Sequence, residues 1–249
     1  MSKSTVLITG AGRGIGAATA LLLAERGHDI ALNYRRDAAA AEALAARIRG
    51  LGRRAITLPA DVADEAAVRS MYRRIDEELG PLGGLVNNAG IVAMKARLDE
   101  MDLARWRRML DTNVLGTLLC SQLAVQRMST RHGGAGGAIV NLSSVAAVLG
   151  SPAMYVDYAA SKGAIDSFTI GLARELATEG VRVNAVRPGI IETDIHAASG
   201  MLERALGQVK DIPIQRLGRA EEVAEAIAWL LSDASSYTVG ALLDVGGGR

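Results

Sequence analysis

Tyr158 and Lys162 stand four residues apart within a helical pattern that runs over residues 155–177. On a helix this spacing places both side chains on one face, one turn from each other. A phenol normally keeps its proton until about pH 10. An ammonium about 4 Å away, at an effective dielectric near 20, would favour the phenolate by roughly 4 kcal/mol, or about 3 pKa units before desolvation. The pair could therefore work as a general acid and base near neutrality, unless the two residues share the face by chance.

A glycine-rich turn lies far from this pair in the sequence, between an apolar run at 5–9 and a helical pattern at 17–26. Its glycines fit the spacing G-x-x-x-G-x-G through Gly10, Gly14 and Gly16. Glycines allow a tight turn, leave backbone N–H groups open to a pyrophosphate at the helix N-terminus, and let the helix sit close to the sheet. The turn therefore predicts a dinucleotide site, the alternative being a merely flexible turn.

Strand-like and helical segments alternate along the rest of the chain. Strands are expected at 29–33, 54–58, 84–87, 138–142, 181–186 and 241–244, and helices at 38–49, 64–79, 155–177 and 221–231, with one or two helices inside 101–131. This alternation predicts an α/β fold of the Rossmann type: a doubly wound parallel sheet of about seven strands with helices on both faces. Ligands of such sheets bind beyond the carboxyl ends of the strands, where the polar clusters of this chain fall.

No linker, composition break or repeat divides the 249 residues, so we expect one domain over 1–249. The long connection at about 190–216 is typical of a lid over a substrate pocket. The formal net charge is +1 and the arginines are interspersed with acids, which argues against nucleic acid as a partner.

The cysteine and histidine content bears on the cellular compartment and on metal binding. Cys120 is the one cysteine, so no disulfide can form within the chain, which favours a reducing compartment. The histidines at 28, 132 and 196 lack metal-ligand spacing, so we expect no metal site. No apolar run approaches the length of a membrane span. We therefore expect a cytoplasmic protein that acts on a small molecule.

Several short motifs occur in an order that resembles the short-chain dehydrogenase/reductase family. They are carried by Thr9, Gly10, Gly14, Ile15, Gly16, Asn87, Asn88, Ala89, Gly90, Asn113, Ser144, Tyr158, Lys162, Pro188 and Gly189. The nearest likeness is to acyl-carrier-protein ketoreductases and glucose-type sugar dehydrogenases. The resemblance implies an oxidoreductase that moves a hydride between a nicotinamide cofactor and a carbonyl or secondary alcohol.

Four residues receive catalytic roles from this resemblance. Tyr158 would donate or take the hydroxyl proton, and Lys162 would lower the tyrosine pKa and hydrogen-bond the nicotinamide ribose. Ser144 would hold the substrate oxygen, while the carbonyl of Asn113 would hold a water that connects the lysine to solvent. From the residues alone, Asn113 could equally be a satisfied core asparagine. Ser144 lies in no G-x-S-x-G elbow, so a serine hydrolase is not expected.

The cofactor preference rests on the end of the second strand. Family members that prefer NAD usually place an acid where this chain has Tyr34, because a carboxylate binds the ribose hydroxyl and repels a 2′-phosphate. Arg35 and Arg36 follow, and Arg13 points into the same region from the glycine turn. Guanidinium groups suit bidentate phosphate contacts. The sequence therefore predicts NADP rather than NAD, unless the two strand-end arginines are simply solvated.

The resemblance places further residues along the same edge of the sheet. Asp61 would contact the adenine, although it could equally hold an Asx-type turn. The expected cofactor-binding residues are Gly10, Arg13, Gly14, Ile15, Gly16, Tyr34, Arg35, Arg36, Asp61, Val62, Asn88, Ala89, Gly90, Tyr158, Lys162, Pro188, Gly189, Ile191 and Thr193. The expected substrate-binding residues are Ser144, Val145, Met154, Tyr155 and Tyr158, with Met94, Ile190 and His196 as further pocket candidates.

Assembly and alternative functions complete the expectations. The segments 101–131 and 155–177 carry apolar residues on more than one face, and family members usually form homotetramers through the matching helices. An NAD-linked sugar or polyol dehydrogenase is the alternative enzyme. A non-catalytic dinucleotide-binding sensor or structural protein is the alternative outside enzymes, because fold alone does not fix function.

Overall fold

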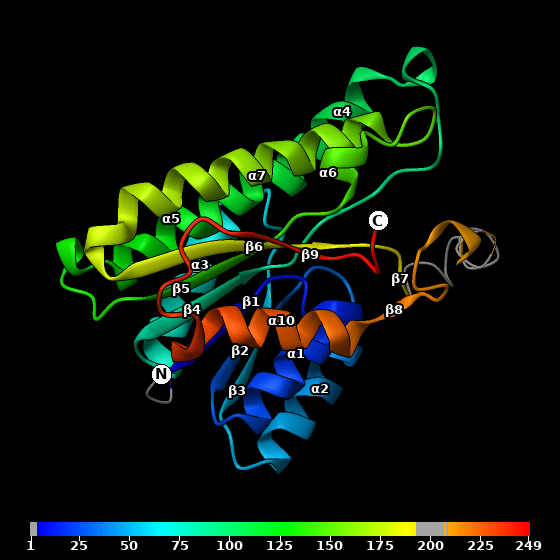
Figure 1. Ribbon diagram of the computed structural model, residues 1–249. Coiled ribbons are helices and arrows are strands. Elements are labelled where there is room, and N and C mark those ends of the chain that lie inside the picture. The colour runs from blue at the N-terminus through cyan, green and yellow to red at the C-terminus, as the bar shows by residue number, and fades with distance from the viewer. Residues whose placement is uncertain (1–3, 193–206, 208) are drawn as a thin grey trace.

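Seven parallel strands form the central sheet of the computed structural model, which describes residues 4–192, 207 and 209–249 (Figure 1). They are β1 (Thr5–Ile8), β2 (Asp29–Tyr34), β3 (Ala55–Pro59), β4 (Leu82–Asn87), β5 (Gly137–Leu142), β6 (Val181–Pro188) and β9 (Leu242–Val245). Their order is β3-β2-β1-β4-β5-β6-β9, so the chain reverses direction across the sheet between β1 and β4. The expected Rossmann-type sheet is confirmed, and its crevice for a ligand lies at this switch point.

Helices cover both faces of the sheet, as the alternating pattern predicted (Figure 1). One face holds α1 (Gly14–Glu25), α2 (Ala38–Gly50) and α10 (Ala220–Leu231), and the other holds α3 (Glu65–Glu78), α5 (Gly116–Met128) and α7 (Val156–Leu176). Each layer has its own apolar core. Leu23, Ile48 and Ile227 pack in the first, and Met71, Leu123 and Leu176 pack in the second.

Local sequence signals explain where several helices begin. Asp64 caps α3 by accepting a 3.1 Å hydrogen bond from the Ala67 N–H, as its residue type predicts. Helix α1 starts at Gly14, three residues before the apolar helical pattern that we used to place it. The reason is that the last glycines of the turn already belong to the first helical turn.

The region 101–131 contains two helices rather than one. A π-helical turn, η2 (Asp111–Leu115), separates α4 (Leu103–Leu110) from α5. Such turns hold one extra residue and often mark functional sites. Asn113 occupies the middle of this turn. The sequence also gave no sign of α6 (Ala146–Leu149) or of the pair β7 (Ile191–Glu192) and β8 (Gly218–Arg219), because elements this short show no periodicity.

The edge strand β9 closes one side of the crevice at the carboxyl ends of the strands. Strand β9 pairs with β6, and the Gly189 N–H donates to the Val245 carbonyl at 3.0 Å. A Cβ on Gly189 would lie 2.8 Å from the Cα of Gly246, so the two chain segments touch through their backbones. Thr193, His196 and most of the expected lid lie outside the described residues, so the lid stays a prediction. Over the part of the chain that is described, no helix is long and apolar enough to cross a membrane.

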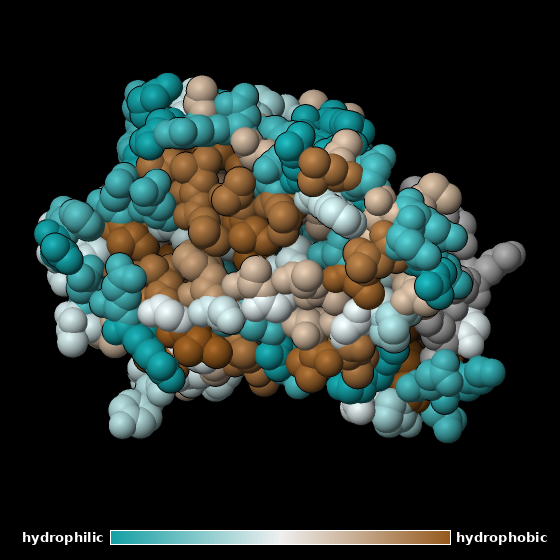
Figure 2. Space-filling view, turned by 90° about the horizontal axis from the view of Figure 1, so that it is seen from above, coloured by the Kyte–Doolittle hydropathy of each residue, from teal (hydrophilic) through white to brown (hydrophobic). Residues whose placement is uncertain are grey.

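One face of α5 and α7 carries apolar side chains that the core leaves partly exposed. Figure 2 looks onto this face and shows them gathered there. They include Leu118, Leu119, Val125, Phe168 and Leu172, which line a shallow groove. Leu123 and Ile165, two further apolar residues of these helices, are buried in the core at 3% and 1% exposure. Helical spacing alone did not distinguish the two faces of helices that are apolar almost all round.

Candidate active site

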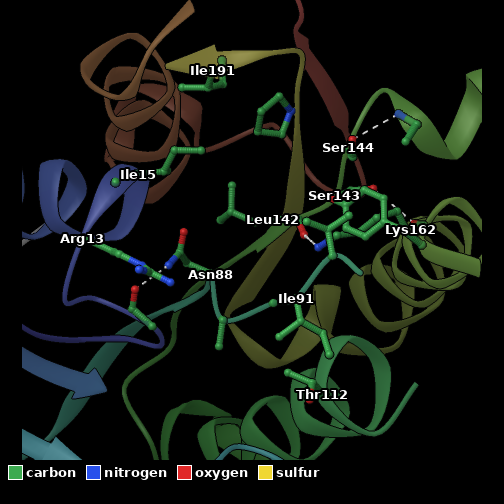
Figure 3. Close-up of a pocket in the computed structure, with 18 of the residues that line it drawn as sticks. Arg13, Ile15, Asn88, Ile91, Thr112, Leu142, Ser143, Ser144, Lys162 and Ile191 are labelled. Atoms are coloured by element: carbon green, nitrogen blue, oxygen red, sulfur yellow. Dashed lines mark hydrogen bonds between the residues drawn. The ribbon is translucent and has the colours of Figure 1, made fainter. Parts of the chain in front are cut away.

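A cavity of about 670 Å³ opens at the carboxyl ends of the strands, between the glycine turn and α7 (Figure 3). Nearly all the predicted cofactor and substrate residues line it. They are Gly10, Arg13, Gly14, Ile15, Tyr34, Arg35, Arg36, Asp61, Val62, Asn88, Ala89, Gly90, Ser144, Val145, Met154, Tyr155, Tyr158, Lys162, Pro188, Gly189, Ile190 and Ile191. Gly16, Met94 and Asn113 are not among its lining residues, and Thr193 lies outside the described part of the chain.

The glycine turn has the geometry of an anion site. Gly10 and Gly14 adopt φ of +64° and +55°, a left-handed conformation that other residues rarely adopt. A Cβ on Gly10 would lie 3.0 Å from the Cα of Ala89. No side chain caps the N-terminus of α1, and its first turn carries no acid. The free end of the helix therefore faces the cavity with its positive dipole uncompensated.

Gly16 serves packing rather than the cavity wall. A Cβ there would lie 2.6 Å from Asn88 Nδ2 and 2.7 Å from the Gly10 carbonyl, so only glycine lets α1 approach so closely. Asn88 in turn donates from Nδ2 to the carbonyls of Thr9 and Gly10 at 2.9 and 3.0 Å. Because these bonds tie the loop after β4 to the turn after β1, Asn88 fixes both walls of the crevice.

Exposed charges lie at the end of the cavity beside the glycine turn, where the sequence predicts the dinucleotide. Arg13, Arg35 and Arg36 are all exposed there. Arg35 Nη1 lies 3.4 Å from Asp61 Oδ2. Asp61 Oδ1 accepts a 3.1 Å bond from the Ala63 N–H, which is the Asx-type turn that the sequence left open. Tyr34 ends β2 without adding a negative charge.

Ser144, Tyr158 and Lys162 meet at the opposite end of the cavity. Figure 3 labels Ser144 and Lys162 at this end. A side-chain hydrogen bond joins Ser144 to Tyr158. Burial raises the pKa of the Tyr158 phenol, and the bond to Ser144 offsets part of that rise. The expected lowering of this pKa by Lys162 is therefore wrong for the free protein. The reason is geometric, because Lys162 Nζ donates to the Leu142 carbonyl at 2.6 Å and lies over the tyrosine ring, 5.6 Å from its centroid.

Lys162 is itself perturbed by its surroundings. Its side chain is buried, and burial lowers its pKa to about 8, with the Asp166 carboxylate opposing the change. The lysine is therefore charged at pH 7 and loses its charge as the pH rises through 8. Ser143 and Ser144 follow β5, and both line the cavity. The Ser143 hydroxyl is engaged elsewhere, because it donates to the Lys162 carbonyl at 3.2 Å. Ser144 is the serine that bonds Tyr158.

Asn113 is a fully bonded core asparagine. Its Oδ1 accepts from the Ile91 N–H at 2.8 Å, and its Nδ2 donates to the Ile91 carbonyl and to Ser161 Oγ at 2.9 and 3.1 Å. These bonds hold the loop after β4 against α7. Its carbonyl accepts a 3.0 Å bond from Thr117 Oγ1. The side chain therefore has a structural task, and the role of the carbonyl in a proton path stays a prediction.

Two loops wall the substrate end. Met154 and Tyr155 follow a strained stretch in which Ser151 and Ala153 adopt φ of +47° and +55°. Such strain is held by surrounding contacts and is frequent at binding sites. The second loop, which follows β4, is tied to this stretch, because the Ala96 N–H donates to the Met154 carbonyl at 3.1 Å. Both walls are therefore fixed relative to each other.

A buried ion pair secures this arrangement. Arg105 of α4 bonds both oxygens of Asp157 at 2.7 and 3.1 Å, one residue before Tyr158, and donates to the Met94 carbonyl at 2.7 Å. Their side chains are only 11% and 5% exposed. The Met94 side chain itself is 86% exposed and points away, contrary to our expectation that it would wall the pocket.

Known proteins resemble this chain in sequence and in fold. The family model described as Enoyl-(Acyl carrier protein) reductase matches residues 10–249. The chain is 51% identical over 243 residues to the uncharacterized oxidoreductase YgfF of Escherichia coli (strain K12), covering 98% of each chain. The chain belongs to the short-chain dehydrogenase/reductase family.

Two further relatives of this short-chain dehydrogenase/reductase carry names that bear on its chemistry. The cis-4-hydroxycyclohexanecarboxylate dehydrogenase of Sinomonas cyclohexanicum is 42% identical over 247 residues, covering 99% of this chain and 96% of that protein. A crystal structure of a short chain dehydrogenase from Burkholderia cenocepacia in complex with NADP matches with a TM-score of 0.91 at 38% identity, covering 99% and 97% of the two chains.

Sequence reasoning missed several residues that shape the site of this family member. Asn33 Oδ1 accepts from the Gly10 N–H at 3.1 Å, which anchors the glycine turn to β2. Thr9 was named in the motif but given no role, and its Oγ1 accepts from the N–H groups of Asn88 and Ala89 at 3.0 and 2.9 Å. Ser151 lines the cavity from the strained loop. The first two are polar residues within or directly after buried strands, and that position was the available signal.

Proposed function

We propose that this short-chain dehydrogenase/reductase transfers a hydride between NADP(H) and a carbonyl or secondary alcohol. The observation that carries the proposal is the distribution of groups in one cavity. A bonded Ser144 and Tyr158 stand beside the buried Lys162 at one end. An uncapped helix N-terminus and exposed arginines stand at the other. A nicotinamide dinucleotide has the matching chemistry, with phosphates at one end and a hydride carrier at the other.

Residues of this chain would then bind the substrate oxygen, transfer its proton and hold the cofactor. Ser144 would hold the substrate oxygen through its hydroxyl, and Tyr158 would give that oxygen its phenolic proton during reduction. Because the pKa of Tyr158 is raised in the free protein, the phenol is protonated at neutral pH and ready to donate. Lys162 would hold the nicotinamide ribose and supply the nearby positive charge. The assembled site also argues against the non-catalytic alternative.

The choice of NADP over NAD rests on charge at the end of β2. The position of Tyr34 carries no carboxylate that would repel a 2′-phosphate, and Arg35 and Arg36 follow it. Asp61 lines the same region, but its carboxylate is already engaged by Arg35 and by a backbone N–H. A relative with the same fold is bound to NADP, which adds support.

The substrate end favours an apolar ketone or alcohol over a sugar or polyol. Around Ser144 and Tyr158, the described lining residues of the cavity are mainly aliphatic: Ile91, Val92, Val145, Ala146, Leu149, Met154 and Ile190. The hydroxyls of a sugar need several polar partners, and the described residues at this end offer no side-chain carboxylate or amide. The relative named for hydroxycyclohexanecarboxylate also suggests a ring alcohol as substrate.

Oxidation of NADPH and NADH by purified protein tests these assignments. The substrates would be cyclohexanones with and without a 4-carboxylate, a ketoacyl thioester and gluconolactone. We expect turnover with NADPH and at least one cyclohexanone. NADPH binding without turnover of any carbonyl would favour the non-catalytic alternative, and a preference for NADH with the lactone would favour the sugar dehydrogenase.

We also propose that copies of this chain assemble through the apolar face of α5 and α7 (Figure 2), forming the homotetramer usual in the family. Leu115 at the start of this face is 55% exposed, although it is a large aliphatic side chain. Light scattering at micromolar concentration should give four times the mass of the chain. A monomer would contradict the proposal.

A further inference from the structure

Asp166 and Arg187 form a buried ion pair directly behind the catalytic end of the cavity. Both Nε and Nη2 of the arginine donate to Asp166 Oδ2, at 3.0 and 2.8 Å. The two side chains are 10% and 17% exposed. Breaking such a pair is costly because it leaves a buried charge without its partner. The pair therefore holds α7 firmly to the end of β6.

The position of this pair connects it to Lys162. Asp166 follows Lys162 by four residues on α7, so the two side chains share a helix face. The arginine belongs to β6 and immediately precedes Pro188, which lines the cavity. Arg187 Nη1 also lies 3.6 Å from Asp244 Oδ1 of β9. Asp244, Arg187 and Asp166 thus form a row of charged contacts that runs from β9 to α7, the helix that carries Lys162.

Few charges act on Lys162 in the described part of the chain. The groups that face it are Tyr158 and Asp166 on α7, Leu142 and Ser143 at the end of β5, Gly90 after β4 and Asn113 in the π-helical turn. Of these only Tyr158 and Asp166 titrate, and only the carboxylate is charged at neutral pH. Helix α6, which packs on α7, has no titratable side chain.

Asp166 also has bonding capacity that Arg187 does not use. Its Oδ1 is buried and has no hydrogen-bond partner among the described residues. A buried carboxylate oxygen without a partner is unfavourable unless a nearby positive charge stabilises it. The Arg187 guanidinium, bonded to the other oxygen, supplies one such charge, and the Lys162 ammonium one helical turn away adds to it.

We propose that Asp166, braced by Arg187, is a positioning residue that keeps the Lys162 ammonium charged where it meets the Tyr158 ring and the end of β5. The consequence for catalysis rests on the proposed function. Without the carboxylate, burial would neutralise the lysine at a lower pH, and the site would lose its positive charge within the working range.

Titration of the lysine side chains tests the proposal without any cofactor. The chain has four lysines, at positions 3, 95, 162 and 210, so carbon-13 labelling at Cε gives few NMR signals. The signal that disappears in Lys162→Met belongs to Lys162. Its midpoint should lie near pH 8 in the wild type. In Asp166→Asn the Lys162 midpoint should fall by about one pH unit. This corresponds to a rise of about tenfold in the acid dissociation constant of the lysine.

Asp157→Asn is the matched control, because Asp157 is also a buried carboxylate of α7 paired with an arginine. It should leave the Lys162 midpoint unchanged. Since Asp166→Asn leaves Arg187 without its partner, a second variant combines Asp166→Asn with Arg187→Gln, which removes both charges. The midpoint should fall in this variant as well. An unchanged midpoint in the folded variants, or an equal fall in Asp157→Asn, would overturn the proposal.

The pH profile of carbonyl reduction supplies the second readout. Its alkaline limb should move to lower pH in Asp166→Asn by the same amount as the lysine midpoint. If the wild type reduces no carbonyl at all, the proposed function fails, while the lysine titration still decides the role of Asp166. A shifted midpoint with an unmoved alkaline limb would remove the catalytic part of the proposal.

Discussion

The two ends of the cavity hold their charges in opposite ways. At the dinucleotide end, Arg35 and Asp61 are 42% and 40% exposed and 3.4 Å apart. At the catalytic end, Lys162 is 5% exposed and bonded to a backbone carbonyl at 2.6 Å. An exposed pair contributes little to stability, so its members can reorient toward a phosphate at small cost. A buried charge cannot reorient, and its surroundings set its pKa.

This difference predicts at which end of the cavity the fold should tolerate substitutions. Recognition at the dinucleotide end depends on the sign of the charge, whereas chemistry at the other end depends on fixed orientation and protonation. Changes at the first end should therefore alter which cofactor binds and leave the fold intact. Changes to Tyr158, Lys162 or the buried ion pairs at the second end should abolish turnover or weaken the fold.

Tyr158→Phe should have the largest effect on turnover. The change removes one oxygen, so carbonyl reduction should fall by at least about 10²-fold, the low end for losing a positioned acid. NADPH affinity, followed by fluorescence, should stay within about twofold of the wild type, because the glycine turn and arginines are untouched. Turnover close to that of the wild type would remove the phenol from the mechanism and with it the contrast between the two ends.

Arg105→Gln should destabilise the protein far more than Arg35→Gln. The first leaves Asp157 buried without a positive partner, which costs about 3 kcal/mol or more. The second opens an exposed pair and should change the free energy of unfolding by less than about 0.5 kcal/mol. Urea denaturation of both variants gives the comparison. Equal losses would show that burial does not separate the two ends as described.

Arg35→Asp should change the cofactor preference. The substitution would replace the proposed phosphate contact with a like-charge clash, so NADPH affinity should fall by about tenfold or more while NADH affinity changes much less. Affinities for both cofactors, measured on the wild type and the variant, test this. A wild type that prefers NADH would contradict our assignment of the phosphate site.

Tyr155→Phe should have the smallest effect. Tyr155 lies three residues before Tyr158 and also lines the cavity, but no lysine follows it by four positions. We expect the Michaelis constant of the carbonyl substrate to change by no more than about threefold, with turnover retained. Loss of turnover here, and not in Tyr158→Phe, would mean that the other tyrosine is the acid.

The sequence predicted the sheet and most of the cavity lining, because hydrophobic periodicity and strand-end polar clusters depend on local spacing. It did not predict how the groups orient. Four-residue spacing places Tyr158 and Lys162 on one face, but the ammonium bonds Leu142, which is distant in sequence. The direction of the tyrosine pKa was wrong for the same reason, since burial depends on the whole fold.

Asn113 and Gly16 illustrate a second limit. The sequence left two roles open at each position: Asn113 could be a core asparagine or part of a proton path, and Gly16 could contact the cofactor or allow close packing. In the structure the side chain of Asn113 bonds Ile91 and Ser161, and Gly16 allows close packing against Asn88. A motif identifies positions that matter but does not separate contact with a ligand from support of the residues that make contact. Only the three-dimensional neighbours separate these roles.

The place of β9 has a consequence for synthesis of the protein. This strand leaves the ribosome after every other strand of the central sheet, yet it pairs with β6, and Gly246 directly behind it packs against Gly189 on the cavity wall. A nascent chain that lacks β9 would expose an unpaired edge of β6, which invites pairing with other chains. We expect chains that stall before this strand to aggregate or be degraded, because the cavity wall at Gly189 can form only after β9 has been synthesised.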